Sequence, residues 1–229
     1  MKPAILLSGT LCDGRAFGTL PEYLAAPLVL DHSSFSDART AAAVLLPSVP
    51  PGSLGIAFSL GGWILLEMLR LAPSHFGGIL LISGNAHPDM PENAEARRER
   101  INLAREAGFD ALFAMEWPLM LGQDRQDDPS IRSIILAMAE DAGHAVHARQ
   151  AEMNISRPDH RALATNPPLP IHVVAGAEDR LCPRERYEVA ASGPSSSLTI
   201  AEGVGHYLPL EAPDVLPPLL KSRFPEYCA

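Results

Sequence analysis

Short apolar runs recur along the chain, and they constrain its fold more than any other feature of the sequence. Most of them lack the polar–apolar alternation of half-exposed strands, so we expect strands that are covered on both faces. Helix-like segments separate the early runs, over Phe17–Leu24, Ala38–Leu46 and Leu60–Leu71. This order predicts an α/β fold with a doubly wound, mainly parallel sheet of about six strands. The predicted strands are Ala4–Leu7, Leu28–Leu30, Leu54–Phe58, Gly78–Ile82, Ile171–Ala175 and Leu198–Ala201.

The alternation of strands and helices stops in the middle of the chain. Helical composition covers Glu92–Ala107, Phe109–Met120 and Ser130–Met153, with no clear strand between them. We therefore predict an α/β core formed by residues 1–86 and 170–229, with an all-helical cap inserted as residues 87–169. Ligands bind beyond the carboxyl ends of the strands in such sheets, so a cap inserted there is expected to cover the ligand pocket.

The predicted cap carries two side-chain patterns. Its first segment is rich in arginine, at Arg97, Arg98, Arg100 and Arg105. A solvated helix face with local ion pairs, such as Glu95 with Arg98, explains this run better than a substrate clamp. The second segment offers an apolar pocket lining, at Phe109, Phe113, Trp117, Leu119 and Met120. His144 and His147 have helical spacing that could suit a metal, but without a third ligand nearby we interpret them as surface helix histidines.

Composition argues against several classes of partner. The 229 residues carry a net charge of −9, which disfavours nucleic acid and anionic membranes. No apolar stretch is as long as a transmembrane helix, and the first apolar run reaches Gly9 too soon for a signal peptide. Cys12, Cys182 and Cys228 are too scattered for a disulfide framework or a metal site. We expect a cytoplasmic protein with a small-molecule substrate, no cofactor and no metal; the oligomeric state stays open.

The segment Gly55–Gly62 reads Gly-Ile-Ala-Phe-Ser-Leu-Gly-Gly and places a serine between a predicted strand and a predicted helix. A serine at such a turn is held in a tight backbone geometry with its hydroxyl exposed above the sheet. The small neighbours Ala57 and Gly61 are needed because larger side chains would collide across the turn. The helix start also offers backbone N–H groups to an oxyanion. Ser59 is therefore the candidate nucleophile.

A serine nucleophile needs a base, usually a histidine that a carboxylate orients. Two later strand ends offer these groups. Glu178 and Asp179 follow the strand that begins at Ile171, and His206 lies in a glycine-containing loop after the last predicted strand. The chain order of serine, acid and histidine is that of α/β-hydrolases.

Four segments in this order resemble the α/β-hydrolase fold superfamily. Within it, the chain is similar to cap-bearing esterases and lactonases of the pimeloyl-ester esterase and enol-lactone hydrolase type. The matching segments are Leu6–Thr10, Ala57–Gly61, Gly176–Asp179 with Pro183, and Gly203–His206 with Glu211 and Pro213, and Arg157–Asp159 also recurs in such relatives. The resemblance implies that Ser59 is the nucleophile, that His206 is the general base and acid, and that Asp179 rather than Glu178 is the orienting carboxylate.

The resemblance also implies an oxyanion hole formed by the backbone N–H groups of Leu60 and Thr10, with Leu11 as the alternative to Thr10. Leu11, Phe113 and Trp117 are the expected pocket residues. Three departures from the family pattern are Ala57 in place of a glycine, Ser8 in place of a histidine that supports the oxyanion loop, and the lack of the N-terminal hairpin.

The implied activity is cleavage of a small carboxylic ester, thioester or lactone through an acyl-enzyme. Carbon–carbon bond hydrolysis and acyl transfer use the same triad, and a non-hydrolytic small-molecule receptor is the alternative from another class. Cys12 is interpreted as a packing residue rather than a reactive thiol. The sequence leaves the roles of His87 and Arg157 open.

Overall fold

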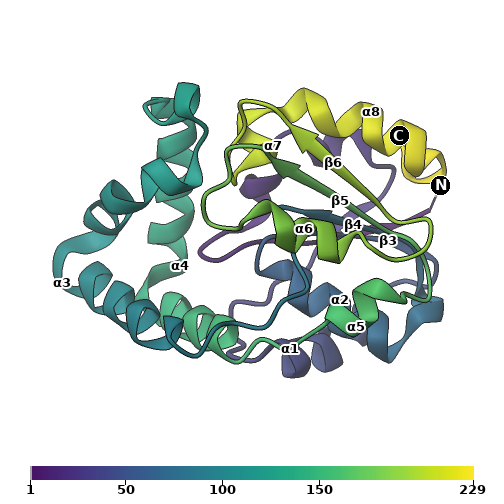
Figure 1. The fold of residues 1–229 in the computed structure, drawn as a ribbon, viewed down its shortest axis with the longest axis horizontal. Helices are drawn as coiled ribbons and strands as arrows, with labels where there is room; N and C mark the ends of the chain where they lie inside the picture. Colours follow the sequence, from purple (N-terminus) through teal and green to yellow (C-terminus); the bar gives the residue numbers. More distant parts are fainter. Residues whose placement is uncertain (1) are drawn as a thin grey trace.

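The computed structural model describes residues 2–229, which form one six-stranded sheet with every neighbouring pair of strands parallel (Figure 1). The strand order is β2-β1-β3-β4-β5-β6. This arrangement confirms the predicted fold class and all six predicted strands to within two residues at each end. The strands are β1 (Ala4–Leu7), β2 (Pro27–Val29), β3 (Ser53–Phe58), β4 (Phe76–Ile82), β5 (Ile171–Gly176) and β6 (Ser197–Ala201).

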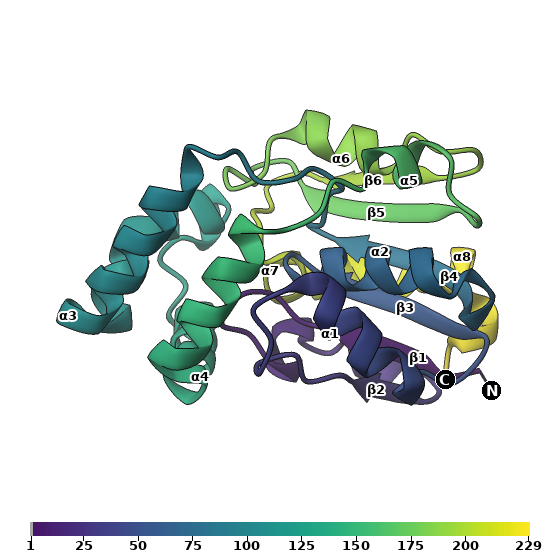
Figure 2. The ribbon, with the colours of Figure 1, turned by 90° about the horizontal axis from the view of Figure 1, so that it is seen from below.

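Helices cover both faces of the sheet, which explains why its central strands are apolar throughout. Successive residues of β1 point to opposite faces: Ala4 and Leu6 belong to one apolar cluster, Ile5 and Leu7 to the other. The first cluster includes residues of α8 (Leu216–Arg223) and α7 (Leu208–Glu211). The second lies under α1 (Ala38–Leu45), α2 (Gly61–Leu71), α5 (Arg161–Thr165) and α6 (Arg184–Ala190), which share one face of the sheet in Figure 2.

Two long helices, α3 (Asn93–Met120) and α4 (Pro129–Ile155), pack on each other and project from the end of the sheet at which its strands finish (Figures 1 and 2). Each is broken at a glycine with positive φ, namely Gly108 at 85° and Gly143 at 74°. A side chain is disfavoured at such a φ, so glycine allows the helix to change direction there. The break in α3 separates the two helical segments expected from the sequence, whereas the single helix expected over Ser130–Met153 is interrupted.

One predicted helix is wrong. The segment Phe17–Leu24 forms two short 3₁₀ turns, Gly14–Phe17 and Leu20–Tyr23, instead of an α-helix. Gly18 between them has a φ of 53°, and a Cβ atom there would lie 2.8 Å from the carbonyl oxygen of Pro209. Close contact with α7 therefore overrides the helical composition of this segment.

The two consecutive prolines near the C-terminus are compatible with a helix because of their position in it. Pro217 and Pro218 lie in the first turn of α8, where a missing backbone N–H breaks no helical hydrogen bond. Among residues 2–229, no helix combines the length and the apolar composition that crossing a bilayer requires.

The break at Gly143 turns two histidines of α4 towards α3. His144 stacks on Phe109 with ring centroids 4.8 Å apart, and His147 lies 5.9 Å from the same ring. His147 is buried, so its interpretation as a surface histidine is wrong. Burial, with the nearby charges of His144, Arg105 and Arg100, lowers the pKa of His147 to about 4.

This shift predicts a pH-dependent contribution of His147 to stability. Because its folded-state pKa lies below the ordinary value of 6.5, the unfolded chain binds more protons between pH 6.5 and about 4. The stability from the neutral ring is therefore complete above pH 6.5 and is lost as the pH falls. His147→Leu should remove about 2 kcal/mol of the loss between pH 7.5 and 4.5, measured by urea unfolding.

Ala145→Leu is the matched control, since Ala145 is exposed on the same helix and does not titrate. It should keep the wild-type dependence of unfolding free energy on pH. Equal slopes for the wild type and both variants would contradict the assignment of this pH dependence to His147.

Candidate active site

Ser59 occupies the turn between β3 and α2 with a φ of 48°, a left-handed conformation that is unusual for a side-chain-bearing residue. Its N–H donates to the carbonyl oxygen of Ile82 on β4 at 3.0 Å, which ties the turn to the sheet. A Cβ atom at Gly61 would collide with the carbonyl oxygen of Leu7 on β1. Ala57, in place of the usual glycine, is buried within β3. The tight turn expected from the sequence is therefore present.

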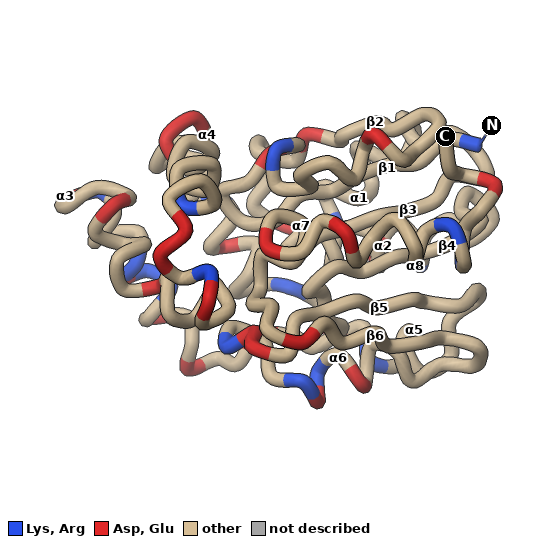
Figure 3. Tube along the Cα trace, turned by 90° about the horizontal axis from the view of Figure 1, so that it is seen from above, with Lys and Arg blue, Asp and Glu red and all other residues tan. Residues whose placement is uncertain are grey.

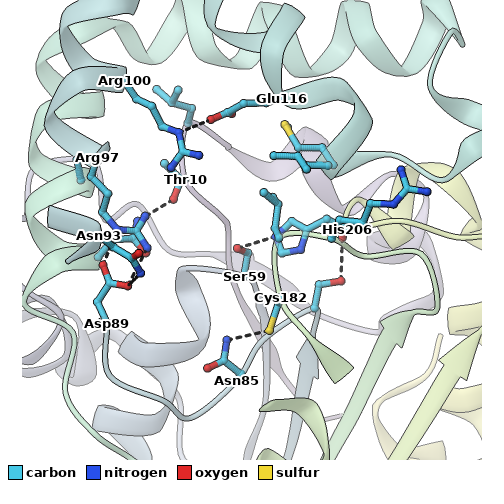
Figure 4. A pocket seen from close by; sticks show the side chains of 18 of the residues that line it. Thr10, Ser59, Asn85, Asp89, Asn93, Arg97, Arg100, Glu116, Cys182 and His206 are labelled. Carbon is cyan, nitrogen blue, oxygen red and sulfur yellow. Dashed lines mark hydrogen bonds and ion pairs between the residues drawn. The ribbon is translucent and has the colours of Figure 1, made fainter. Parts of the chain in front are cut away.

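The three residues expected as a triad lie together at the ends of three strands. Ser59 Oγ donates to His206 Nε2 at 2.9 Å (Figure 4). His206 Nδ1 donates to Asp179 Oδ2 at 2.6 Å. His206 and Asp179 are buried, with 6% and 9% of their surface exposed. Hydroxyl, imidazole and carboxylate form a continuous chain of hydrogen bonds, the arrangement that activates a serine.

Asp179, and not Glu178, is the carboxylate beside His206. Asp179 Oδ1 accepts the backbone N–H groups of Leu181 at 2.9 Å and Cys182 at 3.1 Å. The hydroxyl of Tyr187 also donates to Asp179. Glu178 instead accepts the N–H of Gln123 at 2.6 Å. These donors hold Asp179 in one orientation beside His206.

The loop that carries His206 is held by contacts that sequence reasoning did not identify. Ser83 Oγ donates to the His206 carbonyl oxygen at 2.8 Å, and the His206 N–H donates to Met120 O at 2.7 Å. The buried carboxylate of Glu211 accepts the N–H groups of Gly205 at 2.9 Å and Gly122 at 2.7 Å. Glu211 thus joins the histidine loop to the end of α3. Its presence in the family motif was the available signal for this role.

The backbone N–H groups of Thr10 and Leu60, both near Ser59, have no acceptor among residues 2–229. Both are residues expected to form the oxyanion hole. The Leu11 N–H, the alternative to that of Thr10, donates to the side-chain oxygen of Gln150 at 2.7 Å. Leu11 has a φ of 55°, so this bond fixes a strained residue of the loop. The geometry therefore favours Thr10 over Leu11.

Ser8 stands where related enzymes have a histidine that supports the oxyanion loop, and other hydrogen bonds hold this loop here. Ser8 Oγ donates to the carbonyl oxygen of Cys12 at 2.8 Å, closing the loop on itself. His32 Nε2, from the segment after β2, donates to the Ser8 carbonyl oxygen at 3.0 Å. A histidine from elsewhere in the chain thus supports this loop. Burial raises the pKa of the Cys12 thiol to about 12, which suits a packing residue better than a reactive one.

A cavity of about 420 Å³ opens over Ser59, between the end of the sheet and the helices α3 and α4. Leu11 and Phe113 line it, as expected from the sequence. Trp117, also expected there, is not a lining residue; it stacks on Phe113 with ring centroids 5.0 Å apart. The remaining apolar lining includes Phe58, Trp63, Leu112, Leu119 and Met120.

The arginines of α3 divide between the cavity and solvent. Arg97 and Arg100, three residues apart on one helix face, line the cavity, whereas Arg98 and Arg105 are exposed. The expected pair of Glu95 with Arg98 is replaced by one between Arg98 and Glu152 at 3.3 Å. The prediction that this arginine run is a solvated helix face is therefore wrong for Arg97 and Arg100, which line the cavity.

Arg157, whose role the sequence left open, both joins the cap to the core and lines the cavity. Its guanidinium lies 4.4 Å from the ring centroid of Trp63 and 3.2 Å from Asp89. The carbonyl oxygen of His87 accepts from Arg157 Nε at 3.3 Å and from Trp63 Nε1 at 3.1 Å. His87 therefore contributes its backbone to this junction.

The part of the chain that the structure describes, residues 2–229, contains no cluster of three His, Cys, Asp or Glu side chains arranged to hold a metal ion.

Known proteins resemble this chain both in sequence and in fold. A family model described as the alpha/beta hydrolase family matches residues 7–216. A thermophilic esterase from Thermogutta terrifontis is 20% identical, with a TM-score of 0.83, over 100% of this chain and 91% of that one. A hydrolase from Oleispira antarctica is 19% identical, with a TM-score of 0.78, over 97% and 90%. MenH from S. aureus is 16% identical, with a TM-score of 0.79, over 99% and 94%. Among curated proteins, none matches this chain significantly.

Gln150 provides a prediction about the loop that carries Thr10. Gln150→Leu leaves the buried N–H of Leu11 without its acceptor, and this should lower the free energy of unfolding by about 1–3 kcal/mol. Amide exchange in residues 8–13 should accelerate because the loop loses its tie to α4. Hydrogen-exchange mass spectrometry and urea unfolding measure both effects.

Gln150→Glu retains an acceptor oxygen and should stay closer to the wild type. Gln123→Leu, at an exposed position after α3, is the control and should change neither quantity. Unchanged exchange in Gln150→Leu would show that the loop does not depend on this bond.

Proposed function

This chain belongs to the alpha/beta hydrolase family, and we propose that it is a serine hydrolase that cleaves a small carboxylic ester, thioester or lactone. The observation that carries the proposal is the hydrogen-bonded chain from Ser59 Oγ through His206 to Asp179, with distances of 2.9 and 2.6 Å. A cavity of about 420 Å³ over Ser59 has the size of a small-molecule site.

In the acylation step, Ser59 Oγ attacks the carbonyl carbon of the substrate while His206 Nε2 accepts the hydroxyl proton. Asp179 stabilises the resulting imidazolium, whose Nδ1–H it holds. The negative charge moves to the carbonyl oxygen, where the N–H groups of Leu60 and Thr10 are available to donate. The bond to the leaving oxygen or sulfur then breaks, and His206 returns the proton to that atom.

In the deacylation step, a water molecule takes the place of the leaving group. His206 Nε2 accepts a proton from this water, whose oxygen attacks the acyl carbon of the ester on Ser59. Collapse of the second tetrahedral intermediate breaks the bond to Ser59 Oγ, which recovers its proton from His206. The products are a carboxylic acid and the free enzyme.

Covalent labelling tests the nucleophile directly. A fluorophosphonate probe should modify the wild type, because it phosphonylates an activated serine, and should leave Ser59→Ala unmodified. Ser222→Ala, at an exposed position on α8, should label like the wild type. Absence of labelling in folded wild-type protein, read by intact mass, would contradict the hydrolase proposal and favour a receptor.

Kinetics test the orienting carboxylate. Asp179→Asn keeps the shape of the side chain but removes the charge that holds the histidine tautomer, so kcat should fall by about 10³–10⁴. The screen uses short- and long-chain esters, thioesters and lactones, and the variant is measured on whichever substrate the wild type turns over. A loss of less than about tenfold would exclude Asp179 as the third member of the triad.

A further inference from the structure

The charge of the cavity wall is opposite to that of the protein. The chain carries 27 acidic and 18 basic residues, and acidic positions are distributed over much of it (Figure 3). The residues that line the cavity nevertheless include five arginines and only two carboxylates. The arginines are Arg97, Arg100, Arg157, Arg180 and Arg186, and the carboxylates are Asp89 and Glu116.

Two of these arginines already have local partners. Arg100 pairs with Glu116 at 3.0 Å, and Arg180 donates to the carbonyl oxygen of Pro118 at 2.7 Å. The ion pair of Arg100 with Glu116 leaves this part of the wall with little net charge.

The other three, Arg97, Arg157 and Arg186, form what we call the arginine cluster. Asp89 lies between Arg97 and Arg157, at 2.5 and 3.2 Å from their nitrogens, and Asn93 donates to it at 2.9 Å (Figure 4). The side chain of Arg186, on α6, makes no hydrogen bond or ion pair with any residue from 2 to 229. Arg97 and Arg157 therefore share one carboxylate, and Arg186 adds a third guanidinium group to the same cavity wall.

Repulsion between the positive charges of the arginine cluster costs electrostatic free energy, and a further negative charge bound beside them would offset this cost. Arg157 has only 7% of its surface exposed, so water screens its charge weakly. Burial, together with the charges of Arg97 and Arg186, lowers its pKa to about 10 against the opposing effect of Asp89. Arg97 and Arg186 line the same cavity as Arg157, and the charge of each acts on Arg157.

The contacts that join the cap to the core do not explain why all three arginines of the cluster line the cavity. The stacking of Arg157 on Trp63 and its ion pair with Asp89 are sufficient to join the cap to the core. Arg97 adds a second cation to the same carboxylate, and Arg186 reaches the cavity from the opposite element, α6, without any structural partner. Guanidinium groups present paired donors that match the oxygens of a carboxylate.

We propose that the arginine cluster binds a carboxylate of the substrate, at a distance from the bond that is cleaved. The proposal rests on the proposed function and narrows it: the preferred substrates are esters, thioesters or lactones that carry a second, free carboxylate. Ser59 and the arginine cluster lie on the wall of the same cavity, so one molecule can reach both (Figure 4).

Matched substrate pairs test this preference. Monomethyl adipate and methyl hexanoate differ only by a carboxylate in place of a terminal methyl, on the acyl side. 4-Acetoxybutanoate and butyl acetate differ in the same way on the alcohol side. In at least one pair, the wild type should show a kcat/KM about tenfold or more in favour of the carboxylate. Preference for the neutral ester in both pairs would overturn the proposal.

Variants of α6 assign the preference to the cluster. Arg186→Gln should lower the ratio of kcat/KM between charged and neutral substrates by about tenfold, mainly through KM. Arg184→Gln is the matched control, because Arg184 is exposed on the same helix and pairs with Glu188 outside the cavity. An equal ratio in the wild type and Arg186→Gln would exclude Arg186 from carboxylate binding.

A binding measurement separates this inference from the hydrolase proposal. Calorimetry with Ser59→Ala should detect adipate, with at least fivefold weaker binding when Arg186→Gln is added, whether or not Ser59 is catalytic. Adipate binding in a protein that no fluorophosphonate labels would refute only the proposed function. Hydrolysis without adipate binding would refute only the arginine site, and binding of inorganic phosphate in preference to adipate would overturn the carboxylate assignment.

Discussion

The backbone turn at Ser59 is the constraint on which the rest of the site depends. A left-handed residue that is not glycine costs on the order of 1–3 kcal/mol, and the surrounding sheet must offset this cost. The Ser59 N–H is bonded to Ile82 on β4, and Gly61 packs directly on the backbone of Leu7 on β1. Both neighbouring strands therefore determine where the hydroxyl lies. Because β3 is central and all strands are parallel, the loops with Thr10 and Ser83 finish beside it.

Helix α4 connects the cap to this centre through one of its faces. Gln150, Asn154 and Arg157 follow one another at spacings of four and three residues along the end of α4 and the residues just after it, which place them on one side. Gln150 binds the N–H of Leu11, Asn154 donates to Thr10 Oγ1 at 3.2 Å, and Arg157 meets Asp89. The position of α4 is thereby coupled to the loop that carries Thr10 and Leu11, which we propose to contribute to the oxyanion hole.

Sequence patterns predicted the sheet because its signals are local. Each buried strand is a short apolar run, and the order of serine, acid and histidine follows from three strand ends, which the structure brings within hydrogen-bond distance. The predictions that were wrong concern segments whose local structure is determined by contacts with residues far away in the sequence. Gly18 meets Pro209, which removes a predicted helix, and the break at Gly143 rotates His147 inward. A stripe of Gln150, Asn154 and Arg157 was visible in the sequence, but nothing local indicates what it faces.

The direction in which Arg97 and Arg100 face also required tertiary information, since inward and outward arginines alternate along α3. Their orientation has a kinetic consequence. A net charge of −9 repels an approaching anion at long range, whereas the cluster attracts it only within the cavity, over about one Debye length of roughly 8 Å. Long-range steering therefore does not accelerate the encounter with a carboxylate substrate. For the proposed carboxylate substrate, we therefore expect selectivity to arise after entry, through slower dissociation, and added salt to raise the association rate while weakening retention.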